Sequence, residues 1–202
     1  MRMARFRKAV AWLAVLLPLL AGTARAGTVY DFDQRHGRVN FAVGVLGMFD
    51  VKGSFDRFTG RLDLDLAQPE RSSVSVEFRT DSVSLPAPDQ AALLRSADYL
   101  DAARHPLGRF TSTAITALSP TRYRLEGEVE LRGVRQPLRF EAELRDRHVD
   151  TARGIEVADL VLSGAVLRSA FGMVADRPLL SDTVQLSILM HLEVPHAPPP
   201  AP

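Results

Sequence analysis

The sequence VQLSILMHLEV, residues 184–194, alternates apolar side chains with mostly polar ones. Successive side chains of a β-strand point to opposite faces of the sheet, so this alternation is typical of a strand with one buried face. The apolar face carries Val184, Leu186, Ile188, Met190, Leu192 and Val194, and the opposite face carries Gln185, Ser187, His191 and Glu193. The stretch therefore predicts a long strand near the end of the chain.

The same period of two recurs through most of the sequence. Turn-forming residues separate these alternating stretches, at Gly53, Gly60, Pro69, Pro120, Gly133, Gly154 and Gly172. The alternating apolar sets are Val39, Phe41, Val43 and Val45; Leu62, Leu64 and Leu66; Val74, Val76 and Phe78; Tyr123 and Leu125; Val129 and Leu131; and Leu138, Phe140, Ala142 and Leu144. After the segment at 89–103, Phe110, Ser112 and Ala114 resume the alternation. Many strands at short spacing predict an all-β domain, either a sandwich or a closed barrel.

One segment breaks this pattern. From Asp89 to Ala103 the apolar residues Leu93, Leu94, Ala97 and Leu100 follow a spacing near 3.6, and Asp89 is placed to cap the first turn. The sequence thus predicts a short helical insertion between two groups of strands. Pro106 ends it, and no repeat or linker divides residues 27–195, so we expect one domain.

The two ends of the sequence differ from the domain between them. Basic residues precede an apolar run at 9–22, which is short for a membrane span, and Ala24-Arg25-Ala26 supplies small residues for a signal peptidase. We therefore expect residues 1–26 to be a signal peptide cleaved before Gly27, with an uncleaved membrane anchor as the alternative. The protein would then reside in the periplasm, without a transmembrane segment after cleavage. Residues 196–202 are rich in proline and alanine, which predicts a disordered tail.

Charge and composition exclude several classes of function. Five of the 25 Lys and Arg residues and none of the 24 Asp and Glu residues lie in the predicted signal, which leaves a domain with a net charge of −4. A nucleic-acid partner is therefore not expected. The chain has no cysteine, so it can have neither a thiol nucleophile nor a disulfide.

Catalytic and metal-binding patterns are also missing from the sequence. It contains no Gly-x-Ser-x-Gly elbow and no phosphate-binding glycine loop. The five histidines are not spaced as metal ligands. We therefore expect no catalytic site, metal or cofactor, and we interpret His36 as a structural residue at the first turn and His191 as part of a solvated strand face.

Several short motifs, taken in order, resemble one known family. These are Asp33 and His36 before Val39-Asn40-Phe41; Val51-Lys52-Gly53-Ser54-Phe55 and Phe58-Thr59-Gly60; Leu94-Arg95-Ser96-Ala97-Asp98-Tyr99-Leu100-Asp101; His105-Pro106; Arg109-Phe110-Thr111-Ser112-Thr113; Gly127 with Gly133-Val134; Leu167-Arg168-Ser169-Ala170-Phe171-Gly172; and Leu180-Ser181-Asp182-Thr183-Val184. Together they resemble the YceI-like proteins, which are exported, lipocalin-like and bind isoprenoids. The resemblance implies an eight-stranded antiparallel barrel with an elongated cavity for a polyisoprenoid lipid.

A closed barrel of this size either fills its interior with side chains or holds one small ligand. If the cavity is open, the apolar faces predict the residues that contact the ligand, and the resemblance adds Leu93 and Leu94 at its mouth. The candidate ligand-binding residues are Phe41, Val43, Val45, Phe55, Phe78, Leu93, Leu94, Phe110, Phe140, Phe171, Met173, Ile188 and Met190.

The leading hypothesis is a periplasmic carrier of an isoprenoid-type lipid, polyprenyl or quinone-like. Two alternatives stay open: a filled barrel that acts as an envelope stress or interaction protein, and an enzyme acting on a lipid held in the barrel. A homodimer is an open alternative to a monomer.

Overall fold

A computed structural model describes residues 28–65 and 68–195. The predicted signal peptide, the predicted tail and Leu66 lie outside the described residues. The described chain forms β1 (Thr28–Asp33), β2 (Gly37–Val45), β3 (Phe49–Phe55), β4 (Phe58–Leu64), β5 (Ser73–Arg79), β6 (Val83–Ser84), α1 (Pro88–Arg95), β7 (Leu107–Ala117), β8 (Arg122–Leu131), β9 (Val134–Asp150), β10 (Ile155–Leu167) and β11 (Leu180–Pro195). Short 3-10 turns lie at Pro69–Arg71, Thr80–Ser82 and Arg168–Phe171.

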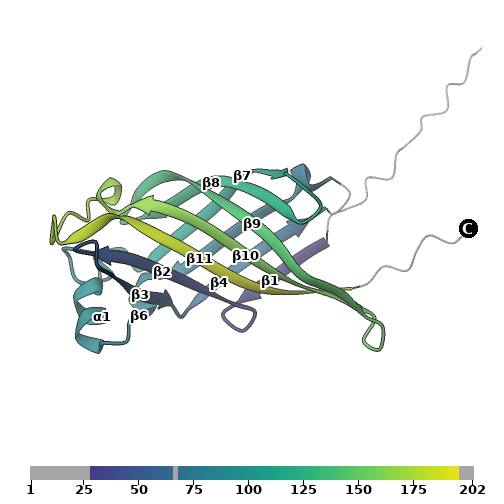
Figure 1. Ribbon diagram of the computed structural model, residues 1–202, viewed down its shortest axis with the longest axis horizontal. Coiled ribbons are helices and arrows are strands. Elements are labelled where there is room, and N and C mark those ends of the chain that lie inside the picture. The colour runs from purple at the N-terminus through teal and green to yellow at the C-terminus, as the bar shows by residue number, and fades with distance from the viewer. Residues whose placement is uncertain (1–27, 66–67, 196–202) are drawn as a thin grey trace, which may run out of the picture.

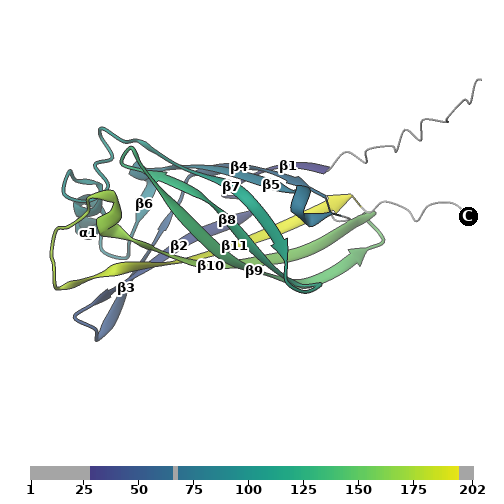
Figure 2. The ribbon, with the colours of Figure 1, turned by 90° about the horizontal axis from the view of Figure 1, so that it is seen from above.

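The strands form one antiparallel sheet that curls on itself (Figures 1 and 2). The order across it is β1-β4-β5-β7-β8-β9-β10-β11-β2-β3-β6. The prediction of an all-β, antiparallel, barrel-like fold is therefore confirmed.

The eleven segments correspond to the eight expected strands, because three strands are each broken in two: β1 with β2, β3 with β4, and β5 with β6. Pairing continues across the second break, where the Asp56 amide donates to the Ser82 carbonyl at 3.1 Å and the Arg79 amide donates to the Arg57 carbonyl at 2.9 Å. Because β2 pairs with both β11 and β3, and β3 continues into β4, the pairs join into a ring. The segments β1 and β6 each pair on one side only.

Strand β11 shows how the sequence pattern becomes a barrel wall. Its apolar residues from Val184 to Leu192 line the interior, whereas Gln185, Ser187 and His191 are exposed outside. Leu189 also lies on the outer face, where it is partly exposed. The neighbouring strand β2 has its apolar residues on the same side, since Ile188 lies opposite the inward-facing Val39.

One expected alternation is wrong. The pattern Phe110, Ser112, Ala114 predicts that Ala114 faces inward, but Ala114 is exposed and Ile115 lines the interior instead. The cause is a register shift between Ser112 and Ala114 in the β7–β8 pair. Such a bulge inserts one extra residue into a strand and exchanges the faces beyond it.

The helical insertion is shorter than expected. Helix α1 ends at Arg95, because Ser96 takes an extended conformation, and tight turns follow. Asp89 is not the cap: Ala87 holds that position without a side-chain hydrogen bond, and Pro88 starts the helix. Proline suits this place because its fixed φ matches the first helical turn. Leu100 is still buried, but by a turn in which its amide donates to the Leu94 carbonyl at 3.0 Å.

Among residues 28–65 and 68–195, no helix has the length and apolar character needed to cross a bilayer.

Candidate functional site

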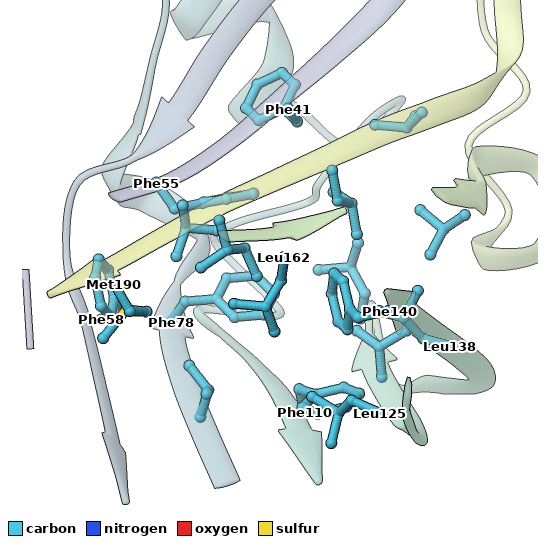
Figure 3. A pocket seen from close by; sticks show the side chains of 18 of the residues that line it. Phe41, Phe55, Phe58, Phe78, Phe110, Leu125, Leu138, Phe140, Leu162 and Met190 are labelled. Carbon is cyan, nitrogen blue, oxygen red and sulfur yellow. The ribbon is translucent and has the colours of Figure 1, made fainter. Parts of the chain in front are cut away.

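The inward faces of the strands enclose one elongated cavity of about 590 Å³. This lies within the range of roughly 300–1,000 Å³ that is common for small-molecule sites. Aromatic and aliphatic side chains from opposite walls face one another across it (Figure 3). The interior therefore offers a long apolar surface with very few hydrogen-bonding groups.

The structure brings all thirteen candidate residues to the lining of this one cavity. That they contact a ligand stays a prediction. Sequence reasoning left out further lining residues, among them Phe58, Leu125, Leu138 and Leu162. Leu125 and Leu138 belong to alternating sets that the sequence showed. Leu162 lies on β10, whose apolar run shows no clear alternation.

Phenylalanine rings along the wall lie over glycines of neighbouring strands. A Cβ added to Gly53 would come within 2.4 Å of the Phe41 ring, and one added to Gly108 would come within 2.2 Å of the Phe78 ring. The pairs Phe32–Gly60, Phe110–Gly127 and Phe140–Gly164 repeat the arrangement. Because glycine has no side chain, each ring can lie close to the wall rather than project into the lumen. These glycines thus help to keep the cavity open.

The rings also contact one another. Phe55 lies between Phe41 and Phe78, with ring centroids 5.6 and 4.8 Å apart, and Phe110 meets Phe140 edge-on at 5.5 Å. Tilted and edge-on pairs at 4.5–7 Å are the favoured arrangements of aromatic rings. The aromatic residues therefore form two clusters of the wall, joined by aliphatic side chains.

The cavity opens at one end of the barrel. Only four of its lining residues are exposed to solvent in the described chain: Phe49, Gln90, Leu93 and Asp176. They come from the start of β3, from helix α1 and from the loop before β11, which meet at the same end of the molecule (Figures 1 and 2). We call this end the mouth.

A buried arginine organises the wall beside the mouth. Arg168 is only 3% exposed, and its guanidinium donates to the backbone carbonyls of Ser181, Met173, Ala175 and Leu180 at 2.7–3.2 Å. Because these carbonyls satisfy the charged group, it is stable in an apolar setting and fixes the loop before β11.

A second polar contact joins this loop to the helical insertion. The Tyr99 hydroxyl donates a hydrogen bond to the Asp176 carboxylate. Burial of the tyrosine, together with its hydrogen bond to this carboxylate, raises the pKa of Tyr99 to about 12. Tyr99 therefore stays neutral at physiological pH and keeps donating.

The histidine–carboxylate pairs lie outside the cavity. Within the described ranges, no three His, Asp or Glu side chains are grouped as metal ligands. His36 lies 3.2 Å from the Asp33 carboxylate at a partly exposed turn, and His191 lies 2.8 Å from the Asp159 carboxylate on the outer face. Neither histidine lines the cavity.

Comparison with known proteins adds sequence relatives. The model of the YceI-like domain matches residues 30–192. A UPF0312 protein of Azotobacter vinelandii is 36% identical over 146 residues, which is 69% of this chain and 76% of that protein. A UPF0312 protein of Pectobacterium carotovorum subsp. carotovorum is 30% identical over 177 residues, which is 87% of this chain and 91% of that protein.

Solved structures share the fold. BcnA of Burkholderia cenocepacia has a TM-score of 0.68 at 20% identity, covering 79% of this chain and 98% of that one. A polyisoprenoid binding domain from Saccharophagus degradans has a TM-score of 0.57 at 12% identity, covering 84% of this chain and 99% of that one. Since the family match spans most of the sequence and the architecture agrees with it, the chain belongs to the YceI-like family.

Proposed function

We propose that this protein binds an isoprenoid-type lipid, polyprenyl or quinone-like, inside its barrel and carries it in the periplasm. The observation that carries the proposal is the cavity of about 590 Å³, whose lining is apolar along its length and open at the mouth. A similar fold in a polyisoprenoid binding domain of Saccharophagus degradans supports the choice of ligand class.

The energetics favour a long hydrocarbon. Burial of apolar surface contributes on the order of 0.8 kcal/mol per CH₂ group, so an isoprene unit of about five carbons contributes roughly 3–4 kcal/mol. Association costs about 4–15 kcal/mol in lost freedom, which a few isoprene units offset. Met173 and Met190 add flexible side chains to the lining, which suits a ligand that varies in shape.

The open cavity favours this function over the two alternatives. A barrel that acts only as an interaction protein has no need of an apolar lumen, and filled cores leave few voids larger than a water molecule. An enzyme acting on the lipid would need a nucleophile or an acid–base pair beside the chain. Of the polar groups that line the cavity near the mouth, Arg168 donates to backbone carbonyls and Tyr99 donates to the Asp176 carboxylate, so these hydrogen bonds fix the loop before β11. We therefore propose binding rather than catalysis.

The test is extraction of lipid from the purified protein, followed by mass spectrometry and by titration with a fluorescent polyprenyl probe. Met190→Trp, on the inner face of β11, should weaken probe binding about tenfold or more while lowering the Tm by only a few degrees. The matched control Ser187→Trp places the same ring on the outer face of the same strand and should change neither. Absence of both extracted lipid and probe binding would refute the proposal.

The periplasmic location has its own test. If residues 1–26 are a signal peptide, N-terminal sequencing of protein from the periplasm should begin at Gly27. A membrane-bound species that begins at Met1 would contradict this part of the proposal.

A further inference from the structure

The most exposed apolar side chains gather at the mouth. Of the exposed large hydrophobic residues in the described chain, those more than half exposed all lie at this end, while the others are 37–44% exposed and scattered. We call this set the apolar rim: Leu46, Met48, Phe49, Leu93, Leu167, Val174 and Leu179. Clusters of this kind mark contact surfaces for proteins or membranes, whereas single exposed apolar residues need no explanation.

The rim is built from segments distant in sequence. The β2–β3 turn supplies the most exposed residue, Met48, at 74%. The loop before β11 reaches this turn, where the Leu46 amide donates to the Leu179 carbonyl at 2.8 Å. Helix α1 completes the mouth (Figures 1 and 2). The tertiary fold thus places projecting apolar tips around one opening.

The rim is continuous with the cavity. Phe49 and Leu93 are 57% and 51% exposed, yet both also line the interior. An apolar path therefore leads from the lumen to the outside of the protein. Moving the lipid from the cavity into water would cost about 0.8 kcal/mol of free energy for every CH₂ group exposed. Uptake and release of the lipid therefore need a partner that receives it directly from the cavity.

Charges around the rim do not favour an anionic surface. The arginines nearest to it are engaged: Arg177 pairs with Asp182 at 2.7 Å, and Arg95 donates to the carbonyls of Asp81 and Val83. On β3, just after the β2–β3 turn, the exposed Asp50 and Lys52 have opposite charges, and the exposed Asp89 lies in the first turn of α1. Membrane binding through anionic lipids uses clusters of Lys and Arg. The rim instead suits a neutral, zwitterionic interface that accepts apolar side chains.

We infer that the apolar rim inserts into the surface of a zwitterionic phospholipid bilayer, so that the cavity takes up and releases its lipid without exposing it to water. The inference rests on the proposed function and adds the partner with which the lipid is exchanged. The apolar face of an interfacial amphipathic helix is buried about 5–10 Å into the boundary between headgroups and acyl chains. The projecting tips of the apolar rim would insert into the same region while the barrel stays outside.

The experiment measures transfer of the fluorescent polyprenyl probe from the protein of residues 27–202 to phosphatidylcholine vesicles. The double variant Met48→Asp/Leu179→Asp changes rim residues that do not line the cavity. We expect it to bind the probe with unchanged affinity but to transfer it at least about tenfold more slowly, because charges oppose insertion. Wild-type transfer should change less than about twofold with added salt or with phosphatidylglycerol in the vesicles.

The matched control is Leu118→Asp/Val149→Asp, which places the same charges at exposed apolar residues away from the mouth and should transfer normally. Equal rates for the rim variant and the wild type would overturn the inference. So would equal slowing by the control variant, or a rim variant that changes only self-association. If the wild type binds no probe at all, the proposed function fails; if it binds the probe but ignores the rim substitutions, only the bilayer contact fails.

Discussion

Gly108→Ala tests how the cavity is kept open. Gly108 lies opposite Phe78 in the β5–β7 pair, and the atoms nearest to an added Cβ all belong to the Phe78 ring, at 2.2, 2.5 and 2.9 Å. Ordinary contact begins at 3.4 Å, so the ring must move by about 1.2 Å. Since the ring lies against the wall, the room for this movement is in the lumen.

We expect Gly108→Ala to change the thermal stability little and the affinity for lipid more. A side chain pushed from its rotamer costs roughly 0.5–1.5 kcal/mol, and replacing glycine by alanine in a compatible backbone stabilises by about 0.4–1 kcal/mol. These nearly cancel, so the Tm should change by less than about 4 °C for a domain of this size. The ring should displace the equivalent of one or two CH₂ groups of ligand, about 0.8 kcal/mol each, which weakens lipid binding roughly 4- to 15-fold.

Thermal unfolding and probe titration measure the two effects on the same samples. The control Gly44→Ala adds a Cβ in β2 whose nearest neighbours are at 3.5 and 3.8 Å, so it should leave affinity unchanged. Adding Phe78→Leu to Gly108→Ala removes the colliding ring atoms and should restore part of the affinity. A Tm that falls by 8 °C or more with unchanged affinity would show that the lumen has no room for the ring and would refute the reasoning.

Three further predictions concern the helical insertion and the loop before β11. Leu94→Asp should lower the free energy of unfolding, measured in urea, by roughly 2 kcal/mol or more, because Leu94 packs against the core. Leu93→Asp, at an exposed position, should lower it by about 0.5 kcal/mol or less. Equal losses of stability would contradict this placement. Tyr99→Phe should remove part of the fall in the free energy of unfolding between pH 10 and 12. The pKa of Tyr99 in the folded protein is about 12, above its usual 10.0, so the stability that this group contributes is lost as the pH rises through this window. A variant whose urea midpoint depends on pH as in the wild type would contradict this prediction. Ser169→Ala should lower the free energy of unfolding at neutral pH and remove part of its fall between pH 3.8 and 2. Hydrogen bonds from Ser169, together with Arg177, hold the pKa of Asp182 at about 2, below its usual 3.8, so the stability present above pH 3.8 is lost as the pH falls toward 2. An unfolding free energy that depends on pH as in the wild type would contradict this role.

The partition of side chains between lumen and solvent could be read from the sequence, because period-two alternation is a local consequence of strand geometry. From this alternation Phe41, Phe110 and Met190 were expected to face the interior, and all three line the cavity although they lie far apart in the chain. The alternation failed at Ala114, where a bulge exchanges the faces, and it missed β10, where Leu160, Val161 and Leu162 are apolar in succession. Local spacing also overextended the helix beyond Arg95, since the burial of Leu100 is achieved by a turn.

Whether the barrel holds a void depends on contacts that no local pattern contains. The rings of Phe41 and Phe78 lie along the wall because the strand register sets Gly53 and Gly108 opposite them. The mouth likewise exists only because the β2–β3 turn, α1 and the loop before β11 meet in space. Alternation along a strand is determined by its own residues, whereas register, ring closure and the size of the lumen are determined by which strands pair, and pairing is a property of the folded chain.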